Sequence, residues 1–243
     1  MKILVIGESC RDIFNYGFCN RLCPDAPAPI VNSIKILENP GMAMNVQQNL
    51  LAMGADVELY TNDNWKSITK TRFVEHNRNY LFIRLDDENA GYGRANVKSI
   101  GYEKYSAIII SDYNKGFLSE KDISYITKSH PKVFLDTKKK LGVWCEDALF
   151  IKINENEYDI SKDKLNENIK NKIILTLGAQ GCKYKETIFP VPKVEIKDSS
   201  GAGDTFISGL VHKYVQEENI FDSIEYANKC ATQVVQKRGV GTI

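Results

Sequence analysis

The sequence predicts an α/β fold in which helices cover a central and mainly parallel sheet. Short apolar runs recur along the chain, and each ends at a glycine or a polar residue, where a buried parallel strand would reach its C-terminal end. Helix-like stretches lie between several of these runs, and this alternation is typical of parallel sheets. The expected strands cover residues 2–7, 106–112, 132–136, 149–154 and 172–178.

Two of the expected helices have recognisable ends. The first covers residues 43–55, and Gly54 is placed to end it in a left-handed conformation. The second begins at Ser119, and Asp122 follows three residues later, which is the pattern of a capping box. Local chemistry therefore supports helices at the positions that the alternation with strands requires.

Two regions interrupt this alternation. Residues 26–37 and 71–89 read as β-strands without the helices found elsewhere, and Arg78 and Asn79 fit a turn in the second region. They predict a small antiparallel sheet that is separate from the main one. This sheet is either a hairpin packed on the core or a lid over a site. We favour the lid, because segments at strand ends often carry function.

Composition excludes several classes of protein. The chain has 243 residues, which suits one good-sized domain, and 43% of them are hydrophobic. Lys and Arg number 32 against 31 Asp and Glu, so the chain lacks the basic excess expected of a nucleic-acid partner. No run of about 20 apolar residues is present to span a membrane, and the apolar N-terminal run is too short for a signal peptide.

The cysteines give no sign of a zinc site. The six cysteines form no Cys-x-x-Cys pair, and none of the three histidines stands at ligand spacing from a cysteine. Six cysteines in a chain of this length are also unlike a short disulfide-rich scaffold. We therefore expect reduced and mostly buried thiols in a cytoplasmic protein.

The stretch "GAGD" is the strongest candidate for a reactive site. Gly201, Ala202 and Gly203 precede Asp204, and the apolar residues that follow recur at helical spacing. A helix that begins here offers unpaired N–H groups and a positive dipole end to an anion. Asp204 is then placed to take a proton from a hydroxyl. The spacing alone fits an ordinary N-terminal turn equally well.

The context of this stretch resembles a known family. "DSSGAGDTF" is similar to the C-terminal signature Asp-x-x-Gly-Ala-Gly-Asp-x-Phe of the PfkB, or ribokinase-like, carbohydrate kinases. The resemblance implies a single kinase domain over 1–243, folded as a three-layer sandwich with a mainly parallel central sheet and a small β-sheet lid. It also implies that Asp204 is the catalytic base and that Gly201, Ala202 and Gly203 form the anion hole for the γ-phosphate of ATP.

Further segments resemble the nucleotide side of the family. "KINENE" is similar to an Asn-x-x-Glu motif near the ATP phosphates and magnesium, although by itself it reads as a solvated helix start. Lys139 and Lys140 are expected to be solvated. The resemblance implies nucleotide contacts from Asp136, Lys138, Asn154, Glu157, Thr176, Gly178, Gly181 and Asn228, with magnesium placed through Asn154 and Glu157 by way of water. Asp198 and Ser200 would hold a monovalent cation such as potassium, as in some members.

The acceptor side resembles one branch of the family more closely. "GMAMN" is similar to the sugar-binding Gly-Gly-x-x-x-Asn motif, with Met42 in place of the second glycine. "RLCPDAPAPIV", "FIRLDDEN" and "SDYNKGFL" resemble the kinase domain of ADP-heptose synthesis proteins, which phosphorylates D-glycero-D-manno-heptose 7-phosphate at O1. The resemblance implies an anionic sugar phosphate as substrate, with Lys115 and then Arg84 as candidates for its distal phosphate. The implied acceptor contacts are Asp12, Gly41, Asn45, Arg84, Asp112 and Lys115.

The chain also departs from the pattern of this branch. Only "TNDNWKSITK" lies between Tyr60 and Thr71, where the family has a further strand–helix unit, so we expect a trimmed sheet edge or lid support. The sequence ends just after "GVGT", which leads us to expect a separate nucleotidyltransferase in the pathway. A homodimer through the lid is expected, because lid strands of the family often pair. Two alternatives stay open, namely a kinase for another sugar, sugar phosphate or nucleoside, and a non-catalytic pseudokinase.

Overall fold

The computed structural model describes residues 1–239 and 241–243, and it contains two sheets. The main sheet has the strand order β12-β11-β10-β9-β8-β7-β1-β4, and every pair from β10 to β4 is parallel. At one edge, β11 runs antiparallel to both of its neighbours, β10 and β12. Its strands are β1 (Lys2–Gly7), β4 (Asp56–Tyr60), β7 (Ala107–Asp112), β8 (Val133–Thr137), β9 (Phe150–Asn154), β10 (Ile173–Thr176), β11 (Cys182–Tyr184) and β12 (Thr187–Phe189). The predicted α/β fold with a mainly parallel sheet is confirmed.

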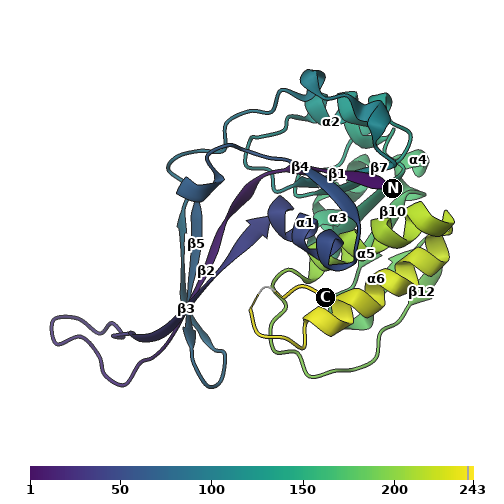
Figure 1. Ribbon diagram of the computed structural model, residues 1–243. Helices are drawn as coiled ribbons and strands as arrows, with labels where there is room; N and C mark the ends of the chain where they lie inside the picture. The colour runs from purple at the N-terminus through teal and green to yellow at the C-terminus, as the bar shows by residue number, and fades with distance from the viewer. Residues whose placement is uncertain (240) are drawn as a thin grey trace.

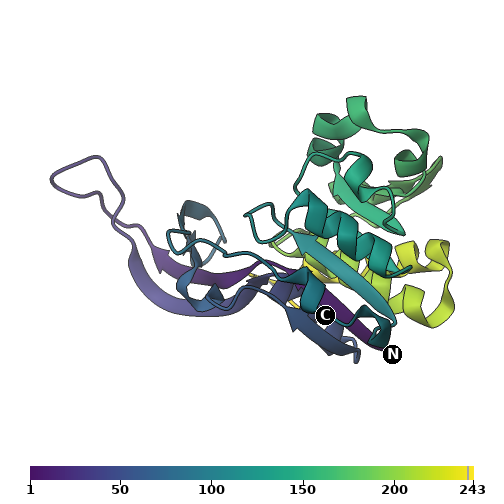
Figure 2. The ribbon, with the colours of Figure 1, turned by 90° about the horizontal axis from the view of Figure 1, so that it is seen from above.

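Helices cover both faces of this sheet, as Figures 1 and 2 show. Alternate residues of a strand point to opposite faces, so Leu4 and Ile6 join one core cluster while Ile3 and Val5 join the other. The first cluster lies under α2 (Glu120–Ser129), α3 (Glu155–Ser161) and α4 (Glu167–Lys170), and the second under α1 (Ala43–Ala52), α5 (Ala202–Glu217) and α6 (Ile220–Val234). The result is the expected three-layer sandwich.

The helix ends follow the local chemistry of the sequence. Ser119 and Asp122 form a reciprocal capping box at the start of α2, as predicted. Gly54 has φ 80° just after α1, a conformation that favours glycine and closes the last turn of the helix.

The second sheet is the lid, with the strand order β3-β2-β5-β6. Its strands are β2 (Ser9–Phe18), β3 (Asn32–Met42), β5 (Thr69–Glu75) and β6 (Leu81–Asp87). The predicted lid differs in three respects: β2 belongs to it, residues 26–31 lie outside its strands, and the sheet is mixed rather than antiparallel because β2 and β5 run parallel. In Figures 1 and 2 these strands extend from one side of the layered domain, and the loop between β2 and β3 forms the far tip.

The lid is joined to the domain by continuous backbone. Only Glu8 separates β1 from β2, and β3 runs directly into α1. Beyond β4, the edge strand of the main sheet, the chain passes through a short 3-10 helix at Trp65–Ser67 and enters β5. The short 61–70 segment therefore leads from the sheet edge straight into the lid.

Three further observations concern the described residues. Their helices include none that is long and apolar enough to cross a membrane. They contain no group of three or more His, Cys, Asp or Glu side chains placed to hold a metal ion. All six cysteines are free thiols, four of them buried, with Cys19 and Cys23 partly exposed in the lid loop.

Candidate active site

Asp204 lies in the first turn of α5 and is the centre of the site. Its side chain is almost fully buried, with 7% of the residue exposed. Asn45 Nδ2 donates a hydrogen bond to Asp204 Oδ2 at 2.8 Å, and the Tyr113 hydroxyl donates one to Oδ1 at 2.6 Å. Hydrogen bonds from α1 on one side and from the loop after β7 on the other thus hold the carboxylate in place.

This environment changes the acidity of the carboxyl group. Burial raises the pKa of Asp204 to about 6, although the hydrogen bonds from Asn45 and Tyr113 oppose the shift. Burial also raises the pKa of Tyr113, so its hydroxyl stays protonated and acts as a donor. A carboxylate with a pKa close to neutral is a better general base than an ordinary surface aspartate.

A polar network between α1 and α5 fixes Asn45. Asn49 Nδ2 donates to the backbone carbonyl of Asn45 at 2.9 Å, and Thr205 Oγ1 donates to Asn49 Oδ1 at 3.1 Å. Ser208 Oγ donates to the backbone carbonyl of Val46 at 3.1 Å. These bonds hold the two helices in register, and therefore hold Asn45 against Asp204.

The N-terminus of α5 carries the positive end of the helix dipole, and a positive side chain, Lys152 of β9, lies beside it. The sequence interpretation missed this lysine. A Cβ at Gly203 would lie 2.8 Å from Lys152 Nζ, so the lack of a side chain there lets the ammonium group lie close to the helix start. Lys152 Nζ is bonded to Asp136 Oδ2 at 2.8 Å, and both side chains are buried. An ammonium group and a helix N-terminus thus converge on one point, which suits an anion.

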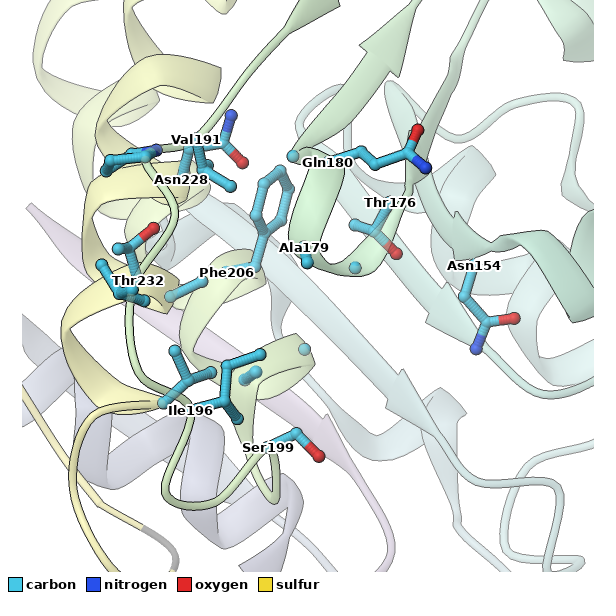
Figure 3. Close-up of a pocket in the computed structure, with 18 of the residues that line it drawn as sticks. Asn154, Thr176, Ala179, Gln180, Val191, Ile196, Ser199, Phe206, Asn228 and Thr232 are labelled. Carbon is cyan, nitrogen blue, oxygen red and sulfur yellow. The ribbon is translucent and has the colours of Figure 1, made fainter.

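A pocket of about 750 Å³ lies at this helix start, and Figure 3 shows its lining. Five predicted nucleotide residues line it, together with Ala202 and Gly203 of the predicted anion hole. Its apolar walls include Val191, Ile196, Phe206 and Val235, which suit a flat base. The five residues are Asn154, Thr176, Gly178, Gly181 and Asn228. The Asn228 amide itself donates to the Phe189 carbonyl at 2.9 Å.

The other predicted nucleotide residues form a charged group next to this pocket. Lys138 bonds to Glu157, and its Nζ lies 3.9 Å from Asp136 Oδ1. Asn154 and Glu157 cap α3 reciprocally, with Asn154 Nδ2 donating to Glu157 Oε1 at 2.9 Å. Magnesium commonly binds through one or two carboxylates, waters and substrate phosphates, and Glu157, bonded to the pocket residue Asn154, supplies one such carboxylate.

Asp12, a predicted acceptor contact, lies in lid strand β2, which follows β1. Its Oδ1 accepts a hydrogen bond from Arg72 Nη1 at 2.6 Å, a contact that the sequence did not predict. Gly41 is adjacent, since a Cβ there would lie 2.9 Å from Asp12 Oδ2. Met42 has φ 61°, a conformation that favours glycine, at the position where the family motif has its second glycine.

The loop after β7 is held by Glu8, another residue that the sequence interpretation missed. Glu8 is fully buried, and its two carboxylate oxygens accept the backbone N–H groups of Tyr113 and Lys115, each at 2.9 Å. This contact positions the Tyr113 hydroxyl toward Asp204. An apolar run followed by Gly-Glu was the only signal in the sequence, and it does not reveal the partner loop.

Two predicted acceptor residues are already engaged by other side chains. The ammonium group of Lys115 pairs with Glu88 at 2.8 Å. Asp112 is buried and bonds to Thr137 and to Lys139 Nζ, the latter at 2.7 Å. Lys139 was expected to be solvated, but its ammonium group instead neutralises the buried carboxylate of Asp112. Contacts of Asp112 and Lys115 with a substrate stay predictions.

Comparison with known proteins agrees with this geometry. A sequence profile described as pfkB family carbohydrate kinase matches residues 103–243. Two curated relatives, each called bifunctional protein HldE, come from a Nitratiruptor species and from Aliarcobacter butzleri, and are 28% and 30% identical to this chain. The alignments cover 99% of the chain but only 63% and 62% of the relatives, so the chain spans less than two thirds of their length. They run over 294 and 295 positions, so the relatives contain segments that these 243 residues lack.

Solved structures show the same fold. The ribokinase of Thermotoga maritima superposes with a TM-score of 0.71 at 16% identity, covering 98% of this chain and 94% of that one. The nucleoside kinase of Methanocaldococcus jannaschii gives a TM-score of 0.72 at 14% identity, covering 98% and 93%. At these identities the likeness concerns the fold alone, and it confirms the expected ribokinase-like architecture.

Replacing the central carboxylate should abolish turnover. We expect Asp204→Asn to lower kcat by ~10²–10⁴-fold, because the amide cannot take a proton. Binding of ATP should persist, since the pocket and the helix start are unchanged, and calorimetric titration would check this. Asp63→Asn, at an exposed position, is the matched control. A near-normal kcat in Asp204→Asn would remove Asp204 from the mechanism.

The pH dependence should report the same group. We expect activity to require the ionised form of Asp204, so kcat/KM should fall as the pH decreases through about 6. Tyr113→Phe removes a hydrogen bond that lowers this pKa, and should therefore move the acidic limb to higher pH. Tyr125→Phe on α2 is the control, and pH–rate profiles of the three proteins are the measurement. If the acidic limb of the pH–rate profile does not move in Tyr113→Phe, its assignment to Asp204 is wrong.

Proposed function

The chain belongs to the pfkB family of carbohydrate kinases, which are ATP-dependent phosphotransferases, and on this basis we propose that it phosphorylates O1 of D-glycero-D-manno-heptose 7-phosphate. The observation that carries the proposal is the buried Asp204 carboxylate beside a helix start and Lys152. The choice of acceptor is supported by the similarity to HldE proteins along the whole chain.

The acceptor hydroxyl would approach Asp204 from the lid side. Asn45 and Tyr113 orient the carboxylate, which accepts the hydroxyl proton as the oxygen attacks the γ-phosphorus. Asp12 and Asn45 lie on the elements that enclose this side, and would hold sugar hydroxyls. The bond between the γ-phosphorus and the bridging oxygen breaks, and ADP leaves.

On the donor side, the N–H groups at the start of α5 and the ammonium group of Lys152 would stabilise the charge of the transferred phosphoryl group. The adenine ring would occupy the apolar part of the pocket. Asn154 and Glu157 would hold magnesium, which when bound neutralises charge on the ATP phosphates. Potassium at Asp198 and Ser200, and a separate nucleotidyltransferase that consumes the product, stay predictions.

The lid would also form a homodimer. Its outer face carries a row across all four strands, in which Ile36, Asn15, Phe73 and Ile83 are neighbours in register. Ile36, Ile83 and Leu85 on this face are each more than half exposed. Asn15 Oδ1 is buried without a hydrogen-bond partner among the described residues. A second copy of this face would cover the apolar side chains and could satisfy the amide.

The substrate assignment predicts a clear preference in a panel assay. With ATP and magnesium, heptose 7-phosphate should give a much higher kcat/KM than unphosphorylated heptose, ribose, fructose 6-phosphate or a nucleoside. ³¹P NMR should identify the product as the 1,7-bisphosphate. A preference for another sugar would overturn the proposed acceptor, while the assignment as a sugar kinase would stand. Stabilisation by ATP without turnover of any acceptor would favour a pseudokinase.

The dimer predicts a response to charge on the outer lid face. Ile83→Glu should convert a dimer into a monomer at micromolar concentration, because it would bury a carboxylate without a partner. Size-exclusion chromatography with light scattering would measure this. Leu51→Glu, at an exposed position on α1, should leave the mass unchanged. A monomeric wild-type protein would contradict the proposed dimer.

A further inference from the structure

The inner face of the lid carries a row of positive side chains beside the acceptor region. In the register of the lid sheet, Arg72 of β5 lies directly opposite Arg84 of β6, and Lys70 lies opposite Asp86. Because side chains two residues apart share a face, Lys70, Arg72 and Arg84 all lie on one side of the sheet. This is also the side of Asp12, since Arg72 bonds to its carboxylate.

Arg72 is mostly buried and has unused donors. Its side chain is 15% exposed, and its guanidinium lies over the Phe14 ring at 4.9 Å. Among the described residues, Asp12 is the only hydrogen-bond acceptor of this side chain, through Nη1 alone. A guanidinium has five N–H donors, so most of the Arg72 donors have no acceptor among the described residues. The group is therefore fixed in place with most of its hydrogen-bonding capacity free.

Arg84 faces Arg72 across the pair of strands β5 and β6. Arg84 Nε and Nη2 bond to the two oxygens of Asp86 at 2.7 and 2.9 Å, and its side chain is 41% exposed. Two like charges directly opposite each other destabilise a sheet. An anion between the two guanidinium groups would remove this cost and accept the free donors of both.

The neighbouring lysines are less available to a ligand. Glu88 accepts from Lys70 Nζ at 2.5 Å, from Lys115 Nζ at 2.8 Å and from the Tyr92 hydroxyl at 3.0 Å. One carboxylate thus satisfies both ammonium groups. The two arginines have no such shared counter-ion among the residues that the structure describes.

The arginine pair is also well placed relative to the reacting end of the acceptor. Asp12, which holds Arg72, lies against Gly41 in β3. β3 continues directly into α1, where Asn45 bonds to Asp204. An acceptor that reaches Asp204 with one hydroxyl would therefore extend past Asp12 toward the lid arginines with its other end.

We propose that Arg72 and Arg84 together bind the anionic group at the far end of the acceptor, and so select sugar phosphates over neutral sugars. The identity of that anion as the 7-phosphate rests on the proposed function. Two guanidinium forks match the oxygens of a phosphate dianion better than a single ammonium group does. Asp12 orients the Arg72 fork and keeps its second oxygen for a sugar hydroxyl.

Kinetics of matched variants would test the pair. Arg84→Gln and Arg72→Lys should each raise KM for heptose 7-phosphate by at least ~10-fold, which corresponds to about 1.4 kcal/mol. Neither should change KM for ATP. Arg72→Lys keeps the charge and removes the fork, so it guards against a simple folding defect. Arg78→Gln, at the exposed turn of the lid, is the control.

The outcomes separate this inference from the proposed function. If heptose 7-phosphate is a good substrate and only Lys115→Gln raises its KM, the arginine assignment is wrong and the function stands. If the wild type prefers another sugar phosphate and the arginine variants raise KM for that substrate, the heptose assignment is wrong. The assignment of the two arginines to the anionic group then stands. A wild type that prefers neutral sugars would overturn both. Calorimetry with heptose 7-phosphate makes the same comparison if turnover is absent.

Discussion

The hydrogen bonds that Asn45 and Tyr113 donate to the buried carboxylate of Asp204 join three separate parts of the fold. Asn45 belongs to α1, which continues the lid strand β3, while Tyr113 belongs to a loop at the end of a central strand. A buried carboxylate without donors would be costly, so the positions of these elements are coupled to one another. The same burial brings the pKa of Asp204 near neutrality, so packing and reactivity have one cause.

The charges around this centre are arranged in pairs that leave particular donors free. Lys152 is balanced by Asp136 and lies against the helix start, where a phosphoryl group would bring negative charge. In the lid, Glu88 balances Lys70 and Lys115, Asp12 pairs with Arg72, and Asp86 pairs with Arg84 and, at 3.5 Å, also with Lys70. Buried ion pairs add little net stability, but they fix the orientation of side chains. Orientation is what catalysis by positioning requires.

The short segment after β4 does not interrupt this arrangement. The chain leaves the sheet edge, makes one short 3-10 helix and enters β5, so Arg72 still reaches Asp12. Tight coupling between β2 and β5 explains this, because the parallel register of these two strands sets the position of Arg72 along β2. The segments that the HldE relatives contain in addition are thus not needed to form the contacts described around Asp204.

Residues close together in the chain determined the main strands, several helix ends and the helix start at Asp204. Apolar runs predicted the main strands, Ser119 and Asp122 predicted a capped helix, and "GAGD" predicted a helix start with Asp204 at its mouth. These features depend on residues close together in the chain, which a sequence displays directly. The tertiary structure alone decided that Tyr113 donates to Asp204, that Glu8 holds the Tyr113 loop, that Lys152 lies against Gly203 and that Arg72 pairs with Asp12. Each of these contacts joins residues far apart in the chain, and it exists only because strand order and register bring them together.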